Sequence, residues 1–177
     1  MNRMEAMSGA QMKSILEAAK TAGFREWAFI TMALSHTYRV SEICKLTVAD
    51  FDLKDKTVSI RRQKGSLHTV EALTPAELEI LPRLIEGKKK SDRLFPFGRF
   101  TAYRFFRRAA EAAGLPKNCR GPHSTKHSIL QAAVDAGATL PQVLQIGGHR
   151  EIESSRRYWN CSQAKADSFR LNLLAVS

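Results

Sequence analysis

Apolar residues recur every three or four positions over most of this chain, which is the spacing of one buried helix face. In the segment that follows Ser8 the apolar positions are Met12, Ile15, Leu16 and Ala19. Ser8 is a favourable N-cap and Gly23 a favourable helix end, so we predict a helix that reaches about Ala22. The same spacing and capping signals predict further helices at about residues 25–35, 40–46, 74–87, 101–113, 124–136, 140–147, 152–161 and 163–174.

The pattern changes from helical spacing to alternation in the second third of the chain. Two short strands are predicted there, Thr57–Arg61 and Leu67–Val70. The residues between them, Gln63–Ser66, are typical of a turn. Together the three segments predict an antiparallel hairpin.

The length of 177 residues and the hydrophobic content of 44% are typical of one domain with a buried core. The chain shows no internal repeat, long linker or low-complexity segment. We therefore predict a single domain over residues 1–177, with a flexible N-terminus over residues 1–7 and a tail helix over residues 163–177. Its predicted fold class is mainly α with a small antiparallel β-sheet (α+β).

The sequence carries no sign of a membrane span, a secretion signal or a disulfide framework. Its longest largely apolar run, from Trp27 to Leu34, is eight residues, whereas a membrane helix needs about 20. The N-terminus lacks the apolar stretch of a signal peptide. The cysteines are odd in number and far apart, at Cys44, Cys119 and Cys161. We therefore expect a cytoplasmic location.

The net charge of +11 is concentrated in the middle of the chain. Residues 61–130 carry 15 Lys and Arg against 6 Asp and Glu. Residues 1–60 carry 8 against 7, and residues 131–177 carry 5 against 4. A basic segment within an otherwise balanced chain favours a polyanionic partner such as nucleic acid. The alternative is a basic surface that contacts only solvent.

Several polar residues lie where simple core or surface patterning does not require them, most of them at predicted helix starts and turns. They are Arg39, Lys64, His123, Lys126, His127, His149 and Tyr158. Backbone N–H groups at a helix start favour anions, and cationic side chains at the same place strengthen that preference. Taken singly, each of these residues has an ordinary structural explanation as a cap, a packing residue or a surface charge.

Three potential metal ligands share a spacing of four residues, namely Cys119, His123 and His127. A zinc site is conceivable from this spacing, but the sequence lacks an obvious fourth ligand and a Cys-x-x-Cys pair. We therefore predict no metal site.

In their order and spacing, the polar residues resemble the catalytic domain of the tyrosine recombinases, the family of phage integrases and of Xer-type and Cre-type enzymes. The resemblance covers about residues 8–175, nearly the whole chain. The matching boxes are Arg39-Val40-Ser41-Glu42-Ile43-Cys44-Lys45-Leu46 with Asp50-Phe51-Asp52, the hairpin lysine Lys64, the His-x-x-Arg box at His123-Ser124-Thr125-Lys126, and the closing box from Gly147-Gly148-His149 to Tyr158.

The resemblance implies a site-specific DNA recombinase that acts in DNA integration, excision or inversion, without a metal or a cofactor. Tyr158 would attack a DNA phosphodiester and form a 3′-phosphotyrosyl link and a free 5′-hydroxyl. His123 would accept the tyrosine proton, and Lys64 would protonate the departing 5′-oxygen. Arg39 and His149 would bind the non-bridging phosphate oxygens.

Lys126 stands where the family has a second arginine, which is the main departure from the family pattern. Lysine keeps the positive charge but loses the bidentate geometry of a guanidinium, so we expect reduced activity. Two functions therefore stay open. The chain is either a working recombinase or a catalytically impaired DNA-binding relative that regulates recombination. A third and weaker alternative is a relaxing activity like that of type IB topoisomerases.

Most relatives carry an amino-terminal helical domain that clamps DNA, whereas only Met1–Met7 precede the first helix predicted here. The resemblance then implies either an excised catalytic domain or a minimal recombinase like the short fimbrial inversion enzymes. In both cases the implied partner is double-stranded DNA, bound through salt-sensitive phosphate contacts. The candidate DNA-binding residues are Arg61, Arg62, Lys88, Lys89, Lys90, Arg104, Arg107 and Arg108.

The predicted tail helix is apolar enough to need a partner surface, because it carries Phe169, Leu171, Leu173 and Leu174. It packs either on its own domain, which is the default, or on a neighbouring subunit. In the family such a segment often docks on a neighbour and couples the active sites. The resemblance therefore implies self-association on DNA in a tetrameric synapse, and a bacterial or phage-encoded protein.

Overall fold

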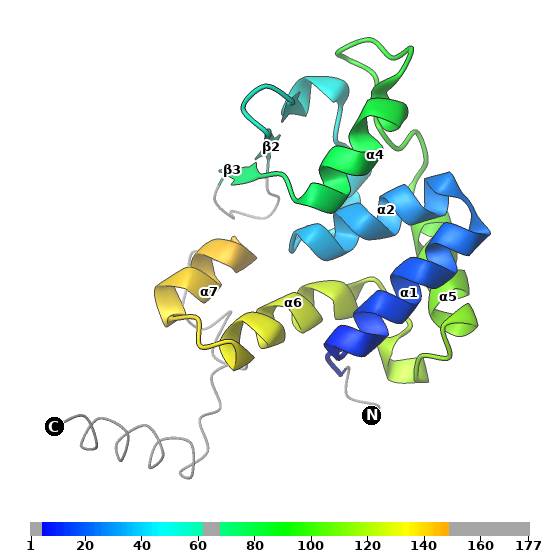
Figure 1. Cartoon of the computed structure of the whole chain (residues 1–177), viewed down its shortest axis with the longest axis vertical. Coiled ribbons are helices and arrows are strands. Elements are labelled where there is room, and N and C mark those ends of the chain that lie inside the picture. Colours follow the sequence, from blue (N-terminus) through cyan, green and yellow to red (C-terminus); the bar gives the residue numbers. More distant parts are fainter. Residues whose placement is uncertain (1–4, 62–67, 149–177) are drawn as a thin grey trace, which may run out of the picture.

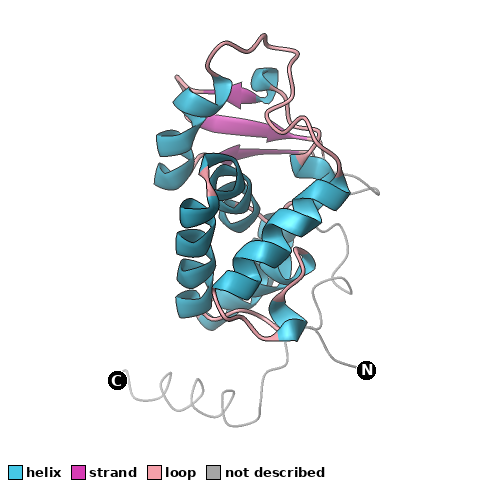
Figure 2. Ribbon diagram, turned by 90° about the vertical axis from the view of Figure 1, so that its right-hand side faces the viewer, coloured by secondary structure: helices cyan, strands magenta, loops and turns pink. Residues whose placement is uncertain are grey.

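The computed structural model of the protein describes residues 5–61 and 68–148, which form a packed set of helices with a small antiparallel sheet at one end (Figures 1 and 2). The α-helices are α1 (Gly9–Ala22), α2 (Phe24–Ser35), α3 (Val40–Ile43), α4 (Pro75–Ile85), α5 (Arg99–Ala112), α6 (His123–Asp135) and α7 (Leu140–Gly147). The strands are β1 (Phe51–Asp52), β2 (Thr57–Ile60) and β3 (Thr69–Ala72), and 3-10 helices span Val48–Asp50 and Lys117–Cys119. The predicted fold class is confirmed. No helix within the two described ranges is long and apolar enough to cross a membrane.

Helix α1 begins where the sequence predicts it, because Ser8 and Gln11 form a reciprocal cap. The Ser8 hydroxyl accepts a hydrogen bond from the Gln11 backbone N–H at 3.2 Å, and the Gln11 side chain accepts one from the Ser8 N–H at 2.8 Å. Both N–H groups would otherwise lack a partner in the helix. Ile15 and Ala19 are fully buried on the predicted apolar face, and α1 packs against α2 and α5.

The predicted flexible N-terminus is described from residue 5 onward. Met7 is 3% exposed, and its backbone N–H donates to the hydroxyl of Ser128 on α6 at 2.7 Å. The residues directly before α1 are therefore fixed to the domain, whereas residues 1–4 lie outside the described part of the chain.

Helix α2 forms the centre of the core. Its residues from Ala28 to Ala33 are all buried, in agreement with a helix that packs on α1, α4, α5 and α6. Phe29 lies edge-on to Phe95 and Phe97, with ring centroids 5.5 and 5.6 Å apart. Aromatic contacts of this geometry stabilise the fold beyond burial alone. They fix the segment between α4 and α5 to α2.

Strand β3 lies two residues later than the predicted Leu67–Val70, and its pairing explains the difference. It is antiparallel to β2 in the register Thr57–Ala72, Val58–Glu71, Ser59–Val70 and Ile60–Thr69. The inner side of β3 therefore carries Thr69 and Glu71, whereas the apolar Val70 is 64% exposed. Polar residues on the inner side reverse the usual pattern, so the apolar residues are a poor guide to the limits of this strand.

Some short elements also differ from the prediction. Strand β1 is not predicted, because it is only two residues long and too short to produce an alternating pattern. Helix α3 ends at Ile43, earlier than the predicted limit, and Cys44, Lys45 and Leu46 continue as a turn. The helices predicted at residues 152–161 and 163–174 lie outside the described residues.

Helices α6 and α7 form a pair at the side of the domain (Figure 1). Leu130 of α6 and Val143 of α7 are fully buried in a small cluster of their own. Gly148 follows α7 in a left-handed conformation with a φ of +60°, which glycine adopts at low cost. The described chain therefore ends in a tight turn, directly before His149.

Replacing Ser8 by alanine is expected to lower the free energy of unfolding by about 1 kcal/mol, because the first turn of α1 loses its cap. Ser14 is the matched control, since its hydroxyl donates to the Ala10 carbonyl within the same helix at 3.0 Å and alanine is the better helix former there. Urea unfolding followed by circular dichroism measures both changes. Equal losses in Ser8→Ala and Ser14→Ala would contradict the capping role.

Candidate functional site

Arg39 is presented by a short loop that leaves the buried end of α2. It is the N-cap of α3, and its backbone and side chain both bond to Glu42. The Arg39 N–H donates to Glu42 Oε2 and the guanidinium Nη1 donates to Glu42 Oε1, each at 2.8 Å. Glu42 is 3% exposed, whereas the Arg39 side chain is 30% exposed. A buried carboxylate thus orients a guanidinium that solvent still reaches, an arrangement suited to binding an anion.

His123 and Lys126 lie three residues apart on α6 and therefore on one side of that helix. His123 is exposed at the start of the helix, and its Nε2 lies 2.8 Å from the hydroxyl of Tyr103 on α5. Lys126 is half-buried, and its Nζ donates to the carbonyl of Gly147, the last residue of α7, at 2.7 Å. Helix α6 thus contacts α5 at one point and the end of α7 at another.

A second bond holds the same end of α7. The Thr37 hydroxyl donates to the Ile146 carbonyl at 2.5 Å. The last carbonyls of a helix have no partner within it, and Thr37 and Lys126 serve two of them here. The loop that presents Arg39, helix α6 and the end of α7 therefore meet at one junction. His149 follows this junction directly in the sequence.

The remaining predicted site residues lie outside the described part of the chain, at Arg62, Lys64, His149 and Tyr158. Their roles stay predictions. The segment that contains Lys64 is bounded by Ile60 at the end of β2 and by Thr69 at the start of β3, and these two residues lie opposite each other. Arg61 follows β2 directly and is exposed.

The described candidates for DNA binding belong to separate elements. Apart from Arg61, the described candidates are Lys88, Lys89 and Lys90 in the loop after α4, and Arg104, Arg107 and Arg108 on α5. Arg107 pairs with Glu111 and lowers the pKa of that exposed carboxyl, and Arg108 pairs with Glu26. Ion pairs of surface arginines contribute little to stability, so these arginines can exchange them for contacts to phosphate.

An ionic cluster that the sequence analysis missed is centred on His36, three residues before Arg39. The His36 Nδ1 lies 2.6 Å from Oε2 of Glu71 on β3, and Nε2 lies 2.9 Å from Oε1 of Glu77 on α4. His36 is 6% exposed and Glu77 is fully buried. The Tyr38 ring stacks on the imidazole with centroids 4.5 Å apart and planes 2° apart.

His36 is an imidazolium at neutral pH. Burial by itself would lower the pKa of His36, but the hydrogen bonds and charges of Glu71 and Glu77 outweigh it and raise the pKa from 6.5 to about 8. Each ring nitrogen faces a carboxylate, so each must carry a proton to donate. The only signal in the sequence is the position of His36 directly after an apolar helix, because its partners are 35 and 41 residues away.

The zinc ligands considered from the spacing are not assembled. Cys119, His123 and His127 are all described, and no group of three His, Cys, Asp or Glu residues within the described ranges could hold a metal ion. The Cys119 thiol donates to the Glu5 carbonyl at 3.6 Å, and burial raises its pKa, which disfavours the thiolate that zinc binds.

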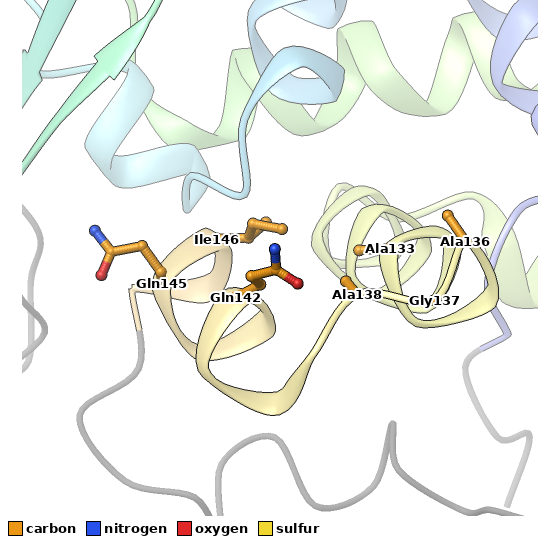
Figure 3. Close-up of a pocket in the computed structure, with 7 residues that line it drawn as sticks. All are labelled: Ala133, Ala136, Gly137, Ala138, Gln142, Gln145 and Ile146. Carbon is orange, nitrogen blue, oxygen red and sulfur yellow. The ribbon is translucent and has the colours of Figure 1, made fainter. Parts of the chain in front are cut away.

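A hollow of about 500 Å³ lies between the end of α6 and α7 (Figure 3). It is lined by Ala133, Ala136, Gly137, Ala138, Gln142, Gln145 and Ile146. None of these side chains is a nucleophile, an acid or a base, so the hollow is not the centre of a reaction. The described candidates for the reaction, Arg39, His123 and Lys126, are not among its lining residues.

Residues 5–165 match the phage integrase family. The type 1 fimbriae regulatory protein FimE of Escherichia coli K12 is 27% identical over 179 residues, which cover 93% of this chain and 90% of that protein. FimB of the same strain, a protein of the same description, is 27% identical over 165 residues, covering 86% of this chain and 82% of that protein. The tyrosine recombinase XerA of Saccharolobus solfataricus is 24% identical over 155 residues, covering 88% of this chain and 52% of that protein.

Solved structures share the fold of this chain. The crystal structure of XerA recombinase matches with a TM-score of 0.77 at 20% identity, over 97% of this chain and 64% of that chain. The Tn1549 transposon integrase in complex with circular intermediate DNA matches with a TM-score of 0.81 at 18% identity, over 96% and 67%. XerH bound to its difH substrate matches with a TM-score of 0.79 at 17% identity, over 96% and 55%. The chain thus spans roughly half to two thirds of these solved chains.

The free energy of unfolding is expected to fall by about 2 kcal/mol between pH 6 and pH 9.5 through His36 alone. The pKa of His36 is about 8 in the folded chain against an ordinary 6.5. The stabilisation is therefore complete below pH 6.5 and is lost as the pH rises through 8. Urea unfolding at the two pH values measures the change. The same pH dependence in His36→Gln would refute this assignment.

Proposed function

This chain belongs to the phage integrase family, the tyrosine recombinases, and we propose on that basis that it is a site-specific DNA recombinase acting through a 3′-phosphotyrosyl intermediate. The observation that carries the proposal is the junction of the Arg39 loop, α6 and the end of α7. A phosphate in the transition state needs cationic donors from distant segments at one point, and this junction supports such a clamp.

In the proposed reaction the Tyr158 oxygen bonds to the scissile phosphorus while the bond from phosphorus to the 5′-oxygen breaks. The tyrosine proton passes to His123, and Lys64 gives a proton to the departing 5′-oxygen. The new ester stores the energy of the broken one, so rejoining by the reverse steps needs no cofactor. Arg39, Lys126 and His149 offset the charge on the non-bridging oxygens.

The contact of His123 with Tyr103 favours one ring nitrogen as the acceptor of the tyrosine proton. Nε2 lies 2.8 Å from the Tyr103 hydroxyl, and Nδ1 of His123 has no bond to another described residue. We assign Nδ1 as the acceptor. This assignment requires the tautomer with hydrogen on Nε2, which then donates to the Tyr103 oxygen and supports the imidazolium once it forms.

Lys126 supplies the observation behind a second candidate function. Its Nζ donates to the Gly147 carbonyl, and an ammonium held in this way is a weaker phosphate ligand than a guanidinium fork. The second candidate is a catalytically impaired DNA-binding relative that regulates recombination. The enzyme is favoured because a binding module has no use for a nucleophile with its acid, base and clamp. These groups are Tyr158, Lys64, His123, Arg39 and His149.

Double-stranded DNA is the proposed partner of the basic surface. The Tn1549 integrase and XerH, which share the fold, are both bound to DNA in their solved structures. Lys89, Lys90 and the arginines of α5 are exposed and suited to phosphate contacts, which weaken steeply with salt. Self-association in a tetrameric synapse on DNA, in the cytoplasm of a bacterium, completes the proposal.

A nicked suicide duplex, which loses a short strand after cleavage, should trap the wild-type protein as a covalent adduct. Tyr158→Phe should form none, because the nucleophile is absent; denaturing gel electrophoresis measures the adduct. Tyr103→Phe is the comparison variant, since Tyr103 also lies beside a candidate base, and it should still form the adduct, though more slowly, because His123 loses a hydrogen-bond partner. If the adduct were absent with Tyr103→Phe and present with Tyr158→Phe, the nucleophile would be Tyr103. Wild-type protein that binds the duplex without forming an adduct would favour the regulatory relative.

Restoring the second arginine in Lys126→Arg should speed cleavage of the same duplex by up to about 10²-fold, because a planar fork replaces a point charge. Single-turnover rates measure the gain. Lys117→Arg makes the same change at an exposed position outside the junction and should leave the rate unaltered. An unchanged or slower rate in Lys126→Arg would show that the lysine is not the weak point of the clamp.

A further inference from the structure

His36, directly after α2, connects the end of that helix to strand β3 and helix α4. Its Nδ1 bonds to Oε2 of Glu71 on β3 at 2.6 Å, and its Nε2 bonds to Oε2 of Glu77 on α4 at 3.1 Å. Glu77 also accepts bonds from the Thr74 N–H and hydroxyl at 2.8 and 2.9 Å, and the Thr74 hydroxyl lies 3.0 Å from that of Ser35. One polar network therefore ties the end of α2 to the start of α4 and to β3.

The network continues along the loop to Arg39. The Tyr38 ring stacks on the His36 imidazole, and the Tyr38 hydroxyl donates to Glu71 at 3.4 Å. Thr37, between the two rings in sequence, bonds to the end of α7. Each residue of the loop is thus held by a side-chain contact. Arg39 is the next residue after Tyr38, so a shift of the network can reach it through the main chain, against its own bonds to Glu42.

The bonds on both sides of the imidazole require both ring protons. Within the described chain, the titratable groups that face His36 are Glu71 from β3, Glu77 from α4 and Tyr38 from its own loop. When His36 loses one proton, a ring lone pair faces a carboxylate, and the carboxylate of Glu77 has no water to turn to because it is fully buried. The two groups then repel each other.

We propose that His36 is a positioning residue for Arg39, because its imidazolium, clamped between Glu71 and Glu77, holds the loop so that the guanidinium meets the scissile phosphate. This inference rests on the proposed function, since Arg39 meets a phosphate only in that reaction. His36 is 6% exposed and acts through Arg39. Loss of its proton at alkaline pH weakens the phosphate clamp without removing a reacting group.

The first test compares two suicide duplexes with the wild-type protein. One carries the normal scissile phosphate, and the other carries a methylphosphonate, in which a methyl group replaces one charged oxygen and removes the charge that Arg39 offsets. Proton transfers by Tyr158, His123 and Lys64 take place on both substrates and cancel in the ratio of their cleavage rates. Lys126 and His149 also offset the charge, so the ratio is measured in Arg39→Ala as well, where the part of the pH dependence that acts through Arg39 should be absent. The ratio of the phosphate to the methylphosphonate rate should be constant up to pH 7 and fall about tenfold by pH 9.5, with its midpoint near 8. A flat ratio overturns the proposal.

The second test is a double-mutant cycle at neutral pH. His36→Gln should slow cleavage of the phosphate duplex about tenfold and change the methylphosphonate rate less than about twofold. In combination with Arg39→Ala it should cause no further loss, because His36 acts through Arg39. His68→Gln is the matched control, since His68 is exposed directly before β3 and outside the network, and it should behave as the wild type. Additive losses in the double variant, or equal slowing on both substrates, overturn the proposal.

These measurements distinguish failure of the His36 role from failure of the proposed recombinase activity. Circular dichroism shows whether His36→Gln folds, and where it does not, the wild-type ratio against pH decides alone. A wild-type adduct with a flat ratio refutes the role of His36 and leaves the recombinase standing. No wild-type adduct on either duplex refutes the recombinase and the role of His36 together.

Discussion

The carbonyl groups that end α7 are the constraint on which the site depends. A helix leaves its last carbonyls without partners of its own, and donors must come from elsewhere. Here they come from Thr37, 109 residues before its acceptor Ile146, and from Lys126, 21 residues before its acceptor Gly147. Because the last carbonyls of α7 need donors, the arginine loop and α6 both contact the end of this helix. The closing box of the family begins at the same place, at Gly147.

The arginine loop has two anchors of different physical character. The bond from Thr37 to α7 is neutral and does not respond to pH, whereas the cluster of His36, Glu71 and Glu77 is ionic and buried. A buried ionic cluster is stable only when complete, because the removal of one member leaves a charge without compensation. Of these two contacts, only the ionic cluster responds to pH.

The sequence predicts what local chemistry determines. Caps such as Ser8 and Thr74 locate the helix starts because their bonds span only three residues. The limits of β3 escape prediction because its inner side carries polar residues that serve the network. The order of the boxes predicts the family, yet it does not reveal that Glu42 orients Arg39 or that His36 lies between two acids. Glu42 has the three-residue spacing of a helix cap, so its contact with Arg39 was open to prediction. The partners of His36 are 35 and 41 residues away, so only the folded chain displays them.

The anchors at the end of α7 are main-chain atoms, and every amino acid supplies them. The two contacts therefore do not depend on which side chains α7 carries. The side chains that line the neighbouring hollow, such as those of Gln142 and Gln145, take no part in them. Side chains on α7 can therefore change without removing these two contacts. Substitutions on the surface of α7 could thus change the binding partners of related domains while the main-chain contacts at its end stay the same.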